Sequence, residues 1–414
     1  MEVKSDRNLL DKQIQLKKIK IFDGDIQFTK GFHKRDLTDT GSHNIHFLQN
    51  NLLVYDQLQV KNVRFRYYDE TRKIDTSGMD YFHLDVSRIN MLVTNGKIDH
   101  DTIFGDVQNL DCQEKCGLQV KQFKCKAKVS TSEVECKNLL IKTELSEIKD
   151  YLQLRYDSFP DFKDFIHKVR IKGELKNSKI ALKDINYFAK GKLTKIDHNL
   201  IRLSGTVTGK VDNFKGKNIE ANWGRNTSFS GSFSFQGLPD FSETFISLKT
   251  TKFTTDYVDL QRTYPHVKYP ENLSRMGTMT YKGNFDGFIG DFVTDGELKS
   301  DLGVISGDLN FKVKGSDLPY YRGAIQTESF YLGKWFNKTE LIGYVSISAE
   351  VEGKGLKMQD LNAQLKKGDV NFIDFKGYRY KDIKVNGAFE KSEFEGKYRD
   401  WETDRKSTRL NSSH

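Results

Sequence analysis

The chain has 414 residues, of which 37% are hydrophobic, 12% aromatic and 30% charged, with 32 glycines and only 5 prolines. Its net charge of +9 comes from 66 Lys and Arg against 57 Asp and Glu, which are mixed along the whole length. These features exclude a collagen-like chain, a proline-rich linker and the clustered basic footprint typical of nucleic-acid binding. The longest apolar run is residues 52–55, so no membrane-spanning helix is predicted.

Strict alternation of apolar and polar residues predicts half-buried strands over most of the chain. An early example keeps one apolar phase from Phe82 to Val86 and the opposite phase from Ile89 to Val93. A shift of one residue moves side chains to the other face of a sheet, so a bulge or turn is predicted near Arg88.

Glycines punctuate these strands, usually followed by a polar and then an apolar residue. An Asn or Asp often precedes the glycine, as at Asn95-Gly96, Asp295-Gly296 and residues 386–387. Such dipeptides favour hairpin turns, because both positions tolerate positive φ. The irregular spacing excludes a solenoid of fixed period, so the prediction is an all-β, long antiparallel meander.

Helical signals are short and local. They cover residues 162–168 after Pro160, 256–263 before Pro265, and 332–337. These segments are expected to be connectors between strands. No linker rich in Pro, Gly or Ser divides the chain, so residues 1–401 are predicted to form one continuous β segment.

The apolar face of a long meander must be covered by something. A sandwich covers it with a second sheet, whereas a sheet that curls without closing leaves a long apolar groove, and the pattern alone does not choose between them. Lys312, Lys314, Glu350 and Glu352 are expected to face water. The side chains that would line an open groove are Phe123, Ala127, Val129, Ile201, Leu203, Val207, Leu309, Phe311, Val313, Val345, Ile347, Ala349, Val351, Ile383, Val385 and Phe389.

Four cysteines lie close together in the sequence, at Cys112, Cys116, Cys125 and Cys136. Their spacing does not match the paired ligands of structural zinc sites. Cys125 and Cys136 fall on apolar phases and are expected to be small core residues. A disulfide that involves Cys112 or Cys116 is left open, because it depends on whether the compartment is oxidising.

Motifs for catalysis or cofactor binding are missing from the sequence. His43 and His46 are the only close histidine pair, and no carboxylate-bearing helix accompanies them. Residues 205–210 differ from a phosphate loop in glycine spacing and lie within an alternating segment. We therefore predict no catalytic residue, no metal ligand and no cofactor, and a protein that is not an enzyme.

One basic row stands out, because Lys124, Lys126 and Lys128 share a polar phase opposite an apolar one. Such a row can touch lipid head groups, although a solvated strand face is the simpler interpretation.

Residues 402–414 have no periodicity and resemble translated sequencing-adapter read-through. They are predicted to be a non-native tail that packs against nothing, with a genuine polar terminus as the alternative. Under this interpretation the natural chain continues beyond about residue 400, and the lack of an apolar leader after Met1 is unsurprising.

Six segments in a fixed order carry a resemblance to a known family. They are residues 116–127, 139–148, 203–214, 231–240, the stretch MGTMTYKGNFDGFIGDFVTDGELKSDLG at 276–303, and YLGKWF at 331–336. Together they resemble the TamB family of translocation and assembly proteins, within the AsmA-like group and especially in its Bacteroidetes-type versions. The resemblance covers residues from about 15 to about 400.

The resemblance implies a curled sheet with an apolar interior that spans the periplasm of a Gram-negative bacterium. It also implies an inner-membrane anchor at the N-terminal end and a TamA/Omp85-type outer-membrane barrel as partner at the C-terminal end, both through regions that this chain lacks. The implied role is transport of phospholipid toward the outer membrane, in support of outer-membrane biogenesis. A scaffold for assembly or secretion of outer-membrane proteins and a purely structural or adhesive β protein are the alternatives.

Overall fold

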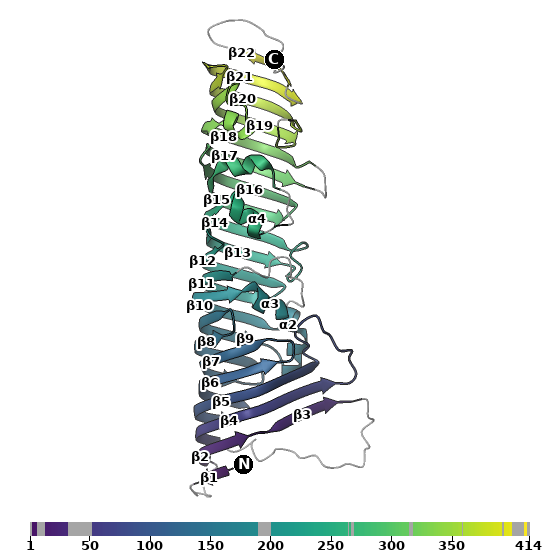
Figure 1. Ribbon diagram of the computed structural model, residues 1–414, viewed down its shortest axis with the longest axis vertical. Helices are drawn as coiled ribbons and strands as arrows, with labels where there is room; N and C mark the ends of the chain where they lie inside the picture. Colours follow the sequence, from purple (N-terminus) through teal and green to yellow (C-terminus); the bar gives the residue numbers. More distant parts are fainter. Residues whose placement is uncertain are drawn as a thin grey trace. The chain divides into compact units, whose positions relative to one another are not determined.

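The computed structural model describes residues 2–5, 13–31, 52–188, 200–263, 265, 269–313, 318–357, 359–390, 393–399 and 410–411. The protein is all-β, with 69% strand in one long, mostly antiparallel meander sheet that is not closed and a few short helices (Figure 1). This confirms the predicted fold class. The chain divides into two compact units, unit 1 (Met1–Lys217) and unit 2 (Asn218–His414).

In unit 1 the strands from β4 to β11 lie side by side in the order of the chain (Figure 1). The strands are β1 (Glu2–Ser5), β2 (Gln13–Phe22), β3 (Asp25–Lys30), β4 (Leu52–Asp69), β5 (His83–Asp99), β6 (Thr102–Glu114), β7 (Gln119–Val129), β8 (Glu133–Lys142), β9 (Glu147–Arg155), β10 (Arg170–Ala181) and β11 (Leu200–Lys210). The helices are η1 (Phe159–Asp164), α2 (Phe165–Lys168) and α3 (Leu182–Phe188), and β12 (Asn213–Trp223) crosses the boundary between the units.

Unit 2 repeats this organisation. Its strands are β13 (Thr227–Gln236), β14 (Phe245–Asp256), β15 (Thr278–Phe288), β16 (Asp291–Ser300), β17 (Gly303–Lys312), β18 (Tyr320–Tyr331), β19 (Ile342–Lys354), β20 (Asn362–Phe375), β21 (Tyr378–Glu390), β22 (Glu393–Arg399) and β23 (Leu410–Asn411). Its helices are α4 (Tyr257–Thr263), η2 (Glu271–Met276) and α5 (Leu332–Phe336). The three predicted helical segments are confirmed, whereas α3 and η2 were not predicted.

The edge of unit 1 departs from the predicted antiparallel order. Strands β2 and β3 both pair with β4 in parallel, one after the other along the same edge. Alternation within a strand does not specify the direction of its neighbour, so this arrangement could not be predicted from the pattern.

β-Bulges keep the apolar phase on one face where the sequence shifts by a residue. Arg88 has a φ of 53°, and the β5–β6 register shifts between Ser87 and Asn90, which confirms the predicted bulge. At three other bulges the extra residue has a positive φ, and its N–H donates to a side chain of the next strand. The pairs are Asn62 N to Asn90 Oδ1, Asn177 N to Ser204 Oγ and Lys367 N to Asn386 Oδ1, each at 2.9 Å. These bonds satisfy donors that the bulge removes from the ladder.

The Asn-Gly and Asp-Gly dipeptides do not form the hairpin turns that the sequence predicted. Asn95-Gly96 lies within β5 and Asp295-Gly296 within β16, and residues 386–387 lie within β21. Gly96 faces Tyr55 on β4, and a Cβ at this glycine would overlap the Tyr55 ring. Close cross-strand packing therefore requires this glycine.

A row of glycines crosses unit 2 at matching positions on neighbouring strands. Gly283 pairs with Gly296, and Gly296 pairs with Gly307. Tyr281 spans this row, and its hydroxyl group contacts Thr294 Oγ1 at 2.7 Å. The ring covers the backbone where side chains are missing, as aromatic neighbours do for glycines in other sheets.

Two of the short helices stabilise turns between strands through a buried aspartate. Asp259 in α4 is 1% exposed, and its carboxylate accepts hydrogen bonds from the N–H groups of Arg225 and Asn226 and from the Thr227 hydroxyl. Burial acts to raise the pKa of Asp259, but these donors act more strongly in the other direction, so the pKa lies below its usual range. In unit 1, Asp184 of α3 plays a similar part by accepting bonds from Thr143 and Ser146.

Two residues of the predicted tail take part in the sheet. Leu410 and Asn411 form β23, which pairs with Phe394 and Glu393 of β22. The sequence did not predict this pairing. Residues 400–409 and 412–414 lie outside the described residues.

Replacing Asp259 with Asn removes the charge that holds the β12–β13 turn. We expect the free energy of unfolding of unit 2 at neutral pH to fall by about 2 kcal/mol, because hydrogen bonds to a charged group are lost. Because the pKa is lowered in the folded state, this contribution is present above a pH of about 4 and is lost as the pH falls further. Denaturant unfolding across pH should give a flatter profile for Asp259→Asn than for the wild type.

Asp308 supplies a matched control, since it is exposed on β17 and has no ion-pair partner among the described residues. Asp308→Asn should leave both the stability and its pH profile unchanged. Equal effects of the two substitutions would contradict the role of Asp259.

Replacing Gly296 with Ala tests the glycine row. A Cβ there would overlap the Lys282 carbonyl oxygen and lie 2.8 Å from Gly283 Cα. We expect a loss of about 2 kcal/mol in the free energy of unfolding, because the backbones must separate. At Gly24 the nearest atom to a Cβ would be 3.5 Å away, so Gly24→Ala should be tolerated. Tolerance of Ala at both positions, measured by thermal melting, would contradict the close approach of β15 and β16.

Candidate functional site

In unit 1 the strand register brings predicted lining residues from distant segments into one row. Ala127 on β7 pairs with Cys136, which pairs with Leu152 on β9. Leu152 in turn pairs with Gly173, and Gly173 with Val207 on β11. The predicted residues of β7 and β11 therefore share one face of unit 1.

Unit 2 shows the same arrangement. Phe311 on β17 pairs with Tyr321 on β18, and Tyr321 pairs with Gly353 on β19. The row continues through Ala363 to Phe389 on β21. We call this side the apolar face of unit 2 and the opposite side its polar face.

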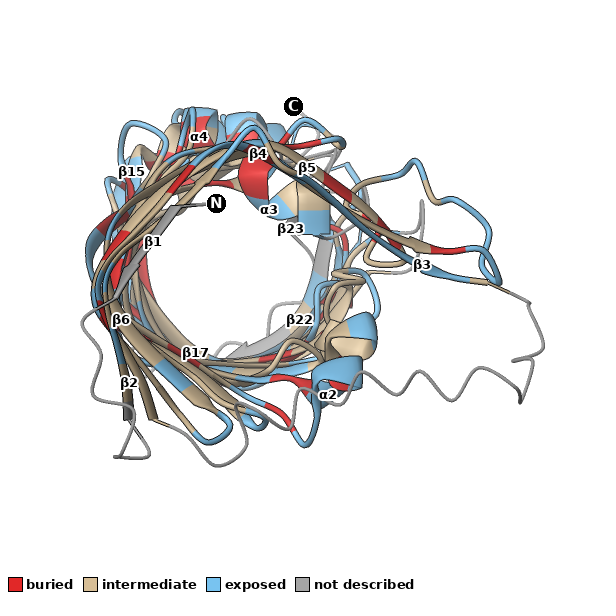
Figure 2. Cartoon of the chain, turned by 90° about the horizontal axis from the view of Figure 1, so that it is seen from below, coloured by how far each residue is buried: buried red, intermediate tan, exposed pale blue. Residues whose placement is uncertain are grey.

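Burial follows the predicted parity. Of the predicted lining residues, Val207, Val345, Ala349 and Val351 are buried, and the other twelve are half-buried. Figure 2 shows that half-buried residues dominate the strands. Whether any of them touch lipid stays a prediction.

The polar phases hold the charges. Glu350 is exposed and pairs with Lys367 at 2.7 Å, while Lys312 pairs with Asp291 at 2.5 Å. Glu352 accepts a hydrogen bond from Tyr320 at 2.9 Å, and Lys314 lies outside the described residues.

One part of the apolar face of unit 2 is covered by helices. Met276, Met279, Leu302, Phe330 and Val345 form a buried cluster. Side chains from α4, η2 and α5 pack on it, together with Ile347 and other strand residues. The helix-covered part is thus ordinary hydrophobic core, and two predicted lining residues, Val345 and Ile347, belong to it.

Aromatic side chains line the rest of this face. The rings of Phe292 and Phe311 stack at 5.3 Å, those of Phe285 and Phe292 at 4.5 Å, and those of Phe233 and Phe235 at 4.4 Å. With Tyr321, which pairs with Phe311, they form what we call the aromatic row. All its members are half-buried, and none belongs to the cluster beneath the helices.

Two neighbouring tyrosines on β18 show how the two faces differ. Tyr320 points to the polar face, where its hydroxyl donates to Glu352 Oε1 at 2.9 Å. Tyr321 points to the apolar face, and its hydroxyl makes no hydrogen bond with the described residues. Burial raises the pKa of Tyr321 to about 12. This shift reflects the apolar surroundings of the Tyr321 hydroxyl in the aromatic row.

The cysteines serve the core of unit 1. Cys125 and Cys136 are each 5% exposed and form a cluster with Leu139, as expected for small core residues. All four cysteines are free thiols. Burial and a hydrogen bond to Glu114 raise the pKa of Cys116 to about 12, which opposes a nucleophilic role.

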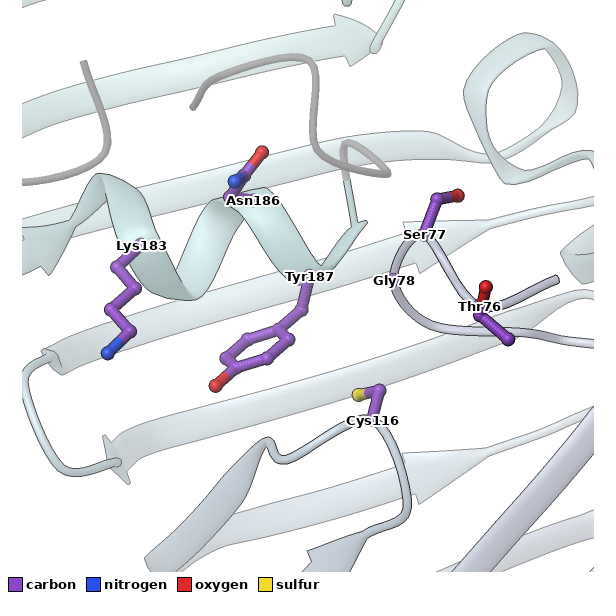
Figure 3. Close-up of a pocket in the computed structure, with 7 residues that line it drawn as sticks. All are labelled: Thr76, Ser77, Gly78, Cys116, Lys183, Asn186 and Tyr187. Carbon is purple, nitrogen blue, oxygen red and sulfur yellow. The ribbon is translucent and has the colours of Figure 1, made fainter. Parts of the chain in front are cut away.

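Cys116 borders a small polar pocket in unit 1 (Figure 3). The pocket has a volume of about 240 Å³ and lies between residues 76–78, Cys116 and side chains of α3. Met79 N donates to the Tyr187 carbonyl at 2.7 Å, which ties this loop to the helix. Its volume is below the usual range of small-molecule sites, and its lining contains no acid–base pair.

In the part of the chain that the structure describes, no group of side chains is arranged for metal binding or for acid–base catalysis. No group of three His, Cys, Asp or Glu side chains there is placed to hold a metal ion. His83 contacts Asp80 at 2.7 Å, but Asp80 also accepts bonds from the N–H groups of Asp75 and Phe82, so this pair organises a loop. His43 and His46 lie outside the described residues.

Sequence reasoning missed most of the aromatic row. Phe233 and Phe235 alternate with serines, and Phe285 and Phe292 occupy apolar phases of their strands, so the signal was present. What alternation does not contain is the position of the helices, which decides which part of the face is covered.

The comparisons add no relative. No family model, no curated protein and no solved structure matches the chain. Among the helices of the described segments, none has both the length and the apolar character needed to cross a bilayer.

Native Cys116 should resist alkylation. At about pH 8 we expect its reaction with iodoacetamide to be at least about 100-fold slower than that of glutathione, because a thiol of high pKa carries little thiolate. Mass spectrometry of the cysteine-containing peptides after timed labelling measures this. Glu114→Gln should speed the reaction, because it removes the carboxylate that disfavours the thiolate. Reaction of wild-type Cys116 at the rate of glutathione would contradict the inert role.

Proposed function

We propose that the chain is a segment of a TamB-like protein that spans the periplasm and carries phospholipid between the inner and outer membranes. The main support for this proposal is the aromatic row. It is an apolar surface that lies beside the helix-covered core, and the helices of that core do not cover it. Surfaces of this kind generally mark binding sites. The resemblance of the sequence to the TamB family supports the same role.

The chemistry of the row suits an acyl chain. Each methylene moved out of water contributes about 0.8 kcal/mol, so a chain lying on several strands is held by burial alone. Phe292 on β16 pairs directly with Phe311 on β17, and Phe285 on β15 stacks on Phe292 from a neighbouring position of the ladder. None of the three side chains offers a polar contact. A lipid would therefore meet similar energies as it moves from strand to strand, and no catalytic residue is required.

The partners in this proposal follow from the resemblance. They are phospholipid, the inner membrane through an N-terminal anchor, and a TamA/Omp85-type barrel in the outer membrane. The anchor and the barrel would be contacted through regions outside this chain.

A second candidate function is a scaffold that assembles or secretes outer-membrane proteins by adding client strands to a sheet edge. Strand β22 favours it, because only Glu393 and Phe394 pair with β23. Among the described residues, the remainder of that edge offers unpaired backbone groups to an incoming strand. Crosslinks from this edge to client proteins, without lipid crosslinks, would favour the scaffold.

Photocrosslinking tests the lipid proposal. A benzophenone side chain at Phe311 should crosslink phospholipid in cells, whereas one at Asn310 should not, because neighbouring residues of a strand face opposite sides. Mass spectrometry of the crosslinked chain identifies the adduct. Equal lipid labelling at both positions, or none at Phe311, would contradict the proposal.

Charge substitutions give a second measure of the same prediction. Phe292→Asp with Phe311→Asp should abolish lipid crosslinking at a probe on Phe285, since an isolated charge on an apolar surface costs several kcal/mol. Val293→Asp with Asn310→Asp is the matched control, because it places the same charges on the polar face of the same two strands. Lipid crosslinking and outer-membrane integrity should stay normal in the control.

A further inference from the structure

Three cations lie side by side at one margin of the sheet in unit 1. Arg155 ends β9, Arg170 begins β10, and the two are directly paired. Ile171 pairs with Gly209, which places Lys210, the last residue of β11, beside Arg170. Like charges directly opposite each other on neighbouring strands are destabilising. In a folded sheet the repulsion within such a row is either neutralised by nearby acidic side chains or balanced by a bound anion.

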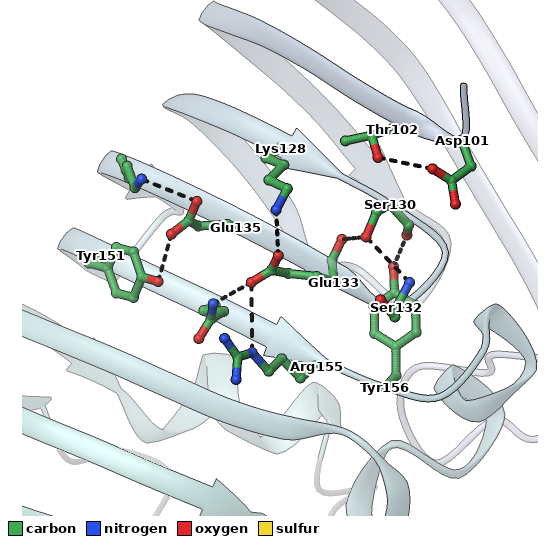
Figure 4. A network of polar contacts seen from close by, with 12 residues as sticks. Asp101, Thr102, Lys128, Ser130, Ser132, Glu133, Glu135, Tyr151, Arg155 and Tyr156 are labelled. Atoms are coloured by element: carbon green, nitrogen blue, oxygen red, sulfur yellow. Dashed lines mark hydrogen bonds and ion pairs between the residues drawn. The ribbon is translucent and has the colours of Figure 1, made fainter. Parts of the chain in front are cut away.

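Acidic side chains of the protein neutralise these three cations only in part. Glu133 Oε1 lies 3.7 Å from Arg155 Nε, but Glu133 also binds Lys128 at 2.9 Å (Figure 4). Arg170 and Lys210 have no ion-pair partner among the described residues. The cluster therefore holds an excess of positive charge.

A pocket lies at this cluster. Its volume is about 510 Å³, and its lining includes Arg155, Lys168, Arg170 and Lys210, with Glu133 and Asp157 as the acidic members. Lys168 is paired with Asp161 of η1 at 3.2 Å. The pocket has room for a small anionic group, and its lining holds four cations against two carboxylates.

The wall of the pocket is built by a packed aromatic residue. Tyr156 is 5% exposed, its ring meets Phe162 of η1 edge to face at 4.7 Å, and its hydroxyl donates to the Ser130 carbonyl at 2.7 Å. Figure 4 shows Tyr156 beside Ser132, close to Glu133 and Arg155. The connection between β9 and β10 thus holds the pocket in shape without a ligand.

We propose that this pocket binds a phosphate group. Two guanidinium groups and two ammonium groups match the charge and the several acceptor oxygens of phosphate, and arginine forms paired hydrogen bonds to such oxygens. The phosphate can come from a free phosphate ester or from a lipid head group. The site lies one residue from Leu154 and Ile171, which pair on the opposite, apolar side. The inference goes beyond the proposed function and does not rest on it.

Binding to two probes tests the site in the full chain. Inorganic phosphate is titrated by calorimetry, and vesicles of phosphatidylcholine with and without phosphatidic acid are tested by flotation. Arg170→Gln with Lys210→Gln should weaken binding at least about tenfold, because two charged donors are removed. Lys176→Gln with Lys179→Gln, which removes two exposed lysines of β10, should change it by less than about twofold.

The outcomes separate the two sources of phosphate. Calorimetric binding of inorganic phosphate identifies a soluble phosphate site, and binding only to phosphatidic acid vesicles identifies a lipid head group. Binding of neither probe, or equal weakening by both double variants, would overturn the proposal.

A stability measurement guards against misfolding of the variant. In chloride buffer the Arg170→Gln, Lys210→Gln variant should melt at or above the wild-type temperature, because like-charge repulsion is relieved. Phosphate should raise the melting temperature of the wild type but not of the variant. A variant that melts well below the wild type would contradict the repulsion from which the site is inferred. Phosphate binding is measured apart from acyl crosslinking at Phe311, so each proposal can fail without the other.

Discussion

Every strand must keep its apolar phase on the same face of the sheet as its neighbours, and the remaining features of both units depend on this constraint. Bulges satisfy it where the sequence gains a residue, with a side chain of the next strand accepting the displaced N–H, as Asn90 does for Asn62. Glycines satisfy it where backbones and rings crowd together, as at Gly96 beneath Tyr55. Because the constraint is local to each strand pair, it repeats along the chain without a fixed sequence period.

The same constraint explains what the sequence could predict. Alternation alone indicated the all-β meander, the bulge at Arg88 and the burial of Cys125, since each depends only on neighbours along one strand. The parallel pairing of β2 with β4 was missed because direction leaves no mark in the alternation. Helix α3 was missed because its seven residues continue directly from β10. Asn95-Gly96 was misassigned because the positive φ of Asn95 serves a bulge in β5 and not a turn. At Asp295-Gly296 and at residues 386–387 neither residue has a positive φ, and both dipeptides are ordinary strand positions.

The candidate site follows from where the helices lie. Helices α4 and α5 follow β14 and β18, strands of the same direction, so both lie over the same end of the apolar face in unit 2. The helices cover that end of the face and make it part of the hydrophobic core, and the aromatic row lies beside it. The predicted lining residues were chosen by phase, which does not distinguish Val345 in the core from Phe311 in the row. A lipid-carrying role and a phosphate pocket in unit 1 would give one chain surfaces for both parts of a phospholipid, each resting on its own observations.

The central claim is that the aromatic row of unit 2 takes up acyl chains. Native mass spectrometry of the intact chain, purified in mild conditions from a Gram-negative host, measures this directly. We expect adducts with the masses of phospholipids, released when the chain is unfolded. A chain that carries no such adduct, and that gains none after incubation with phospholipid vesicles, would contradict the claim.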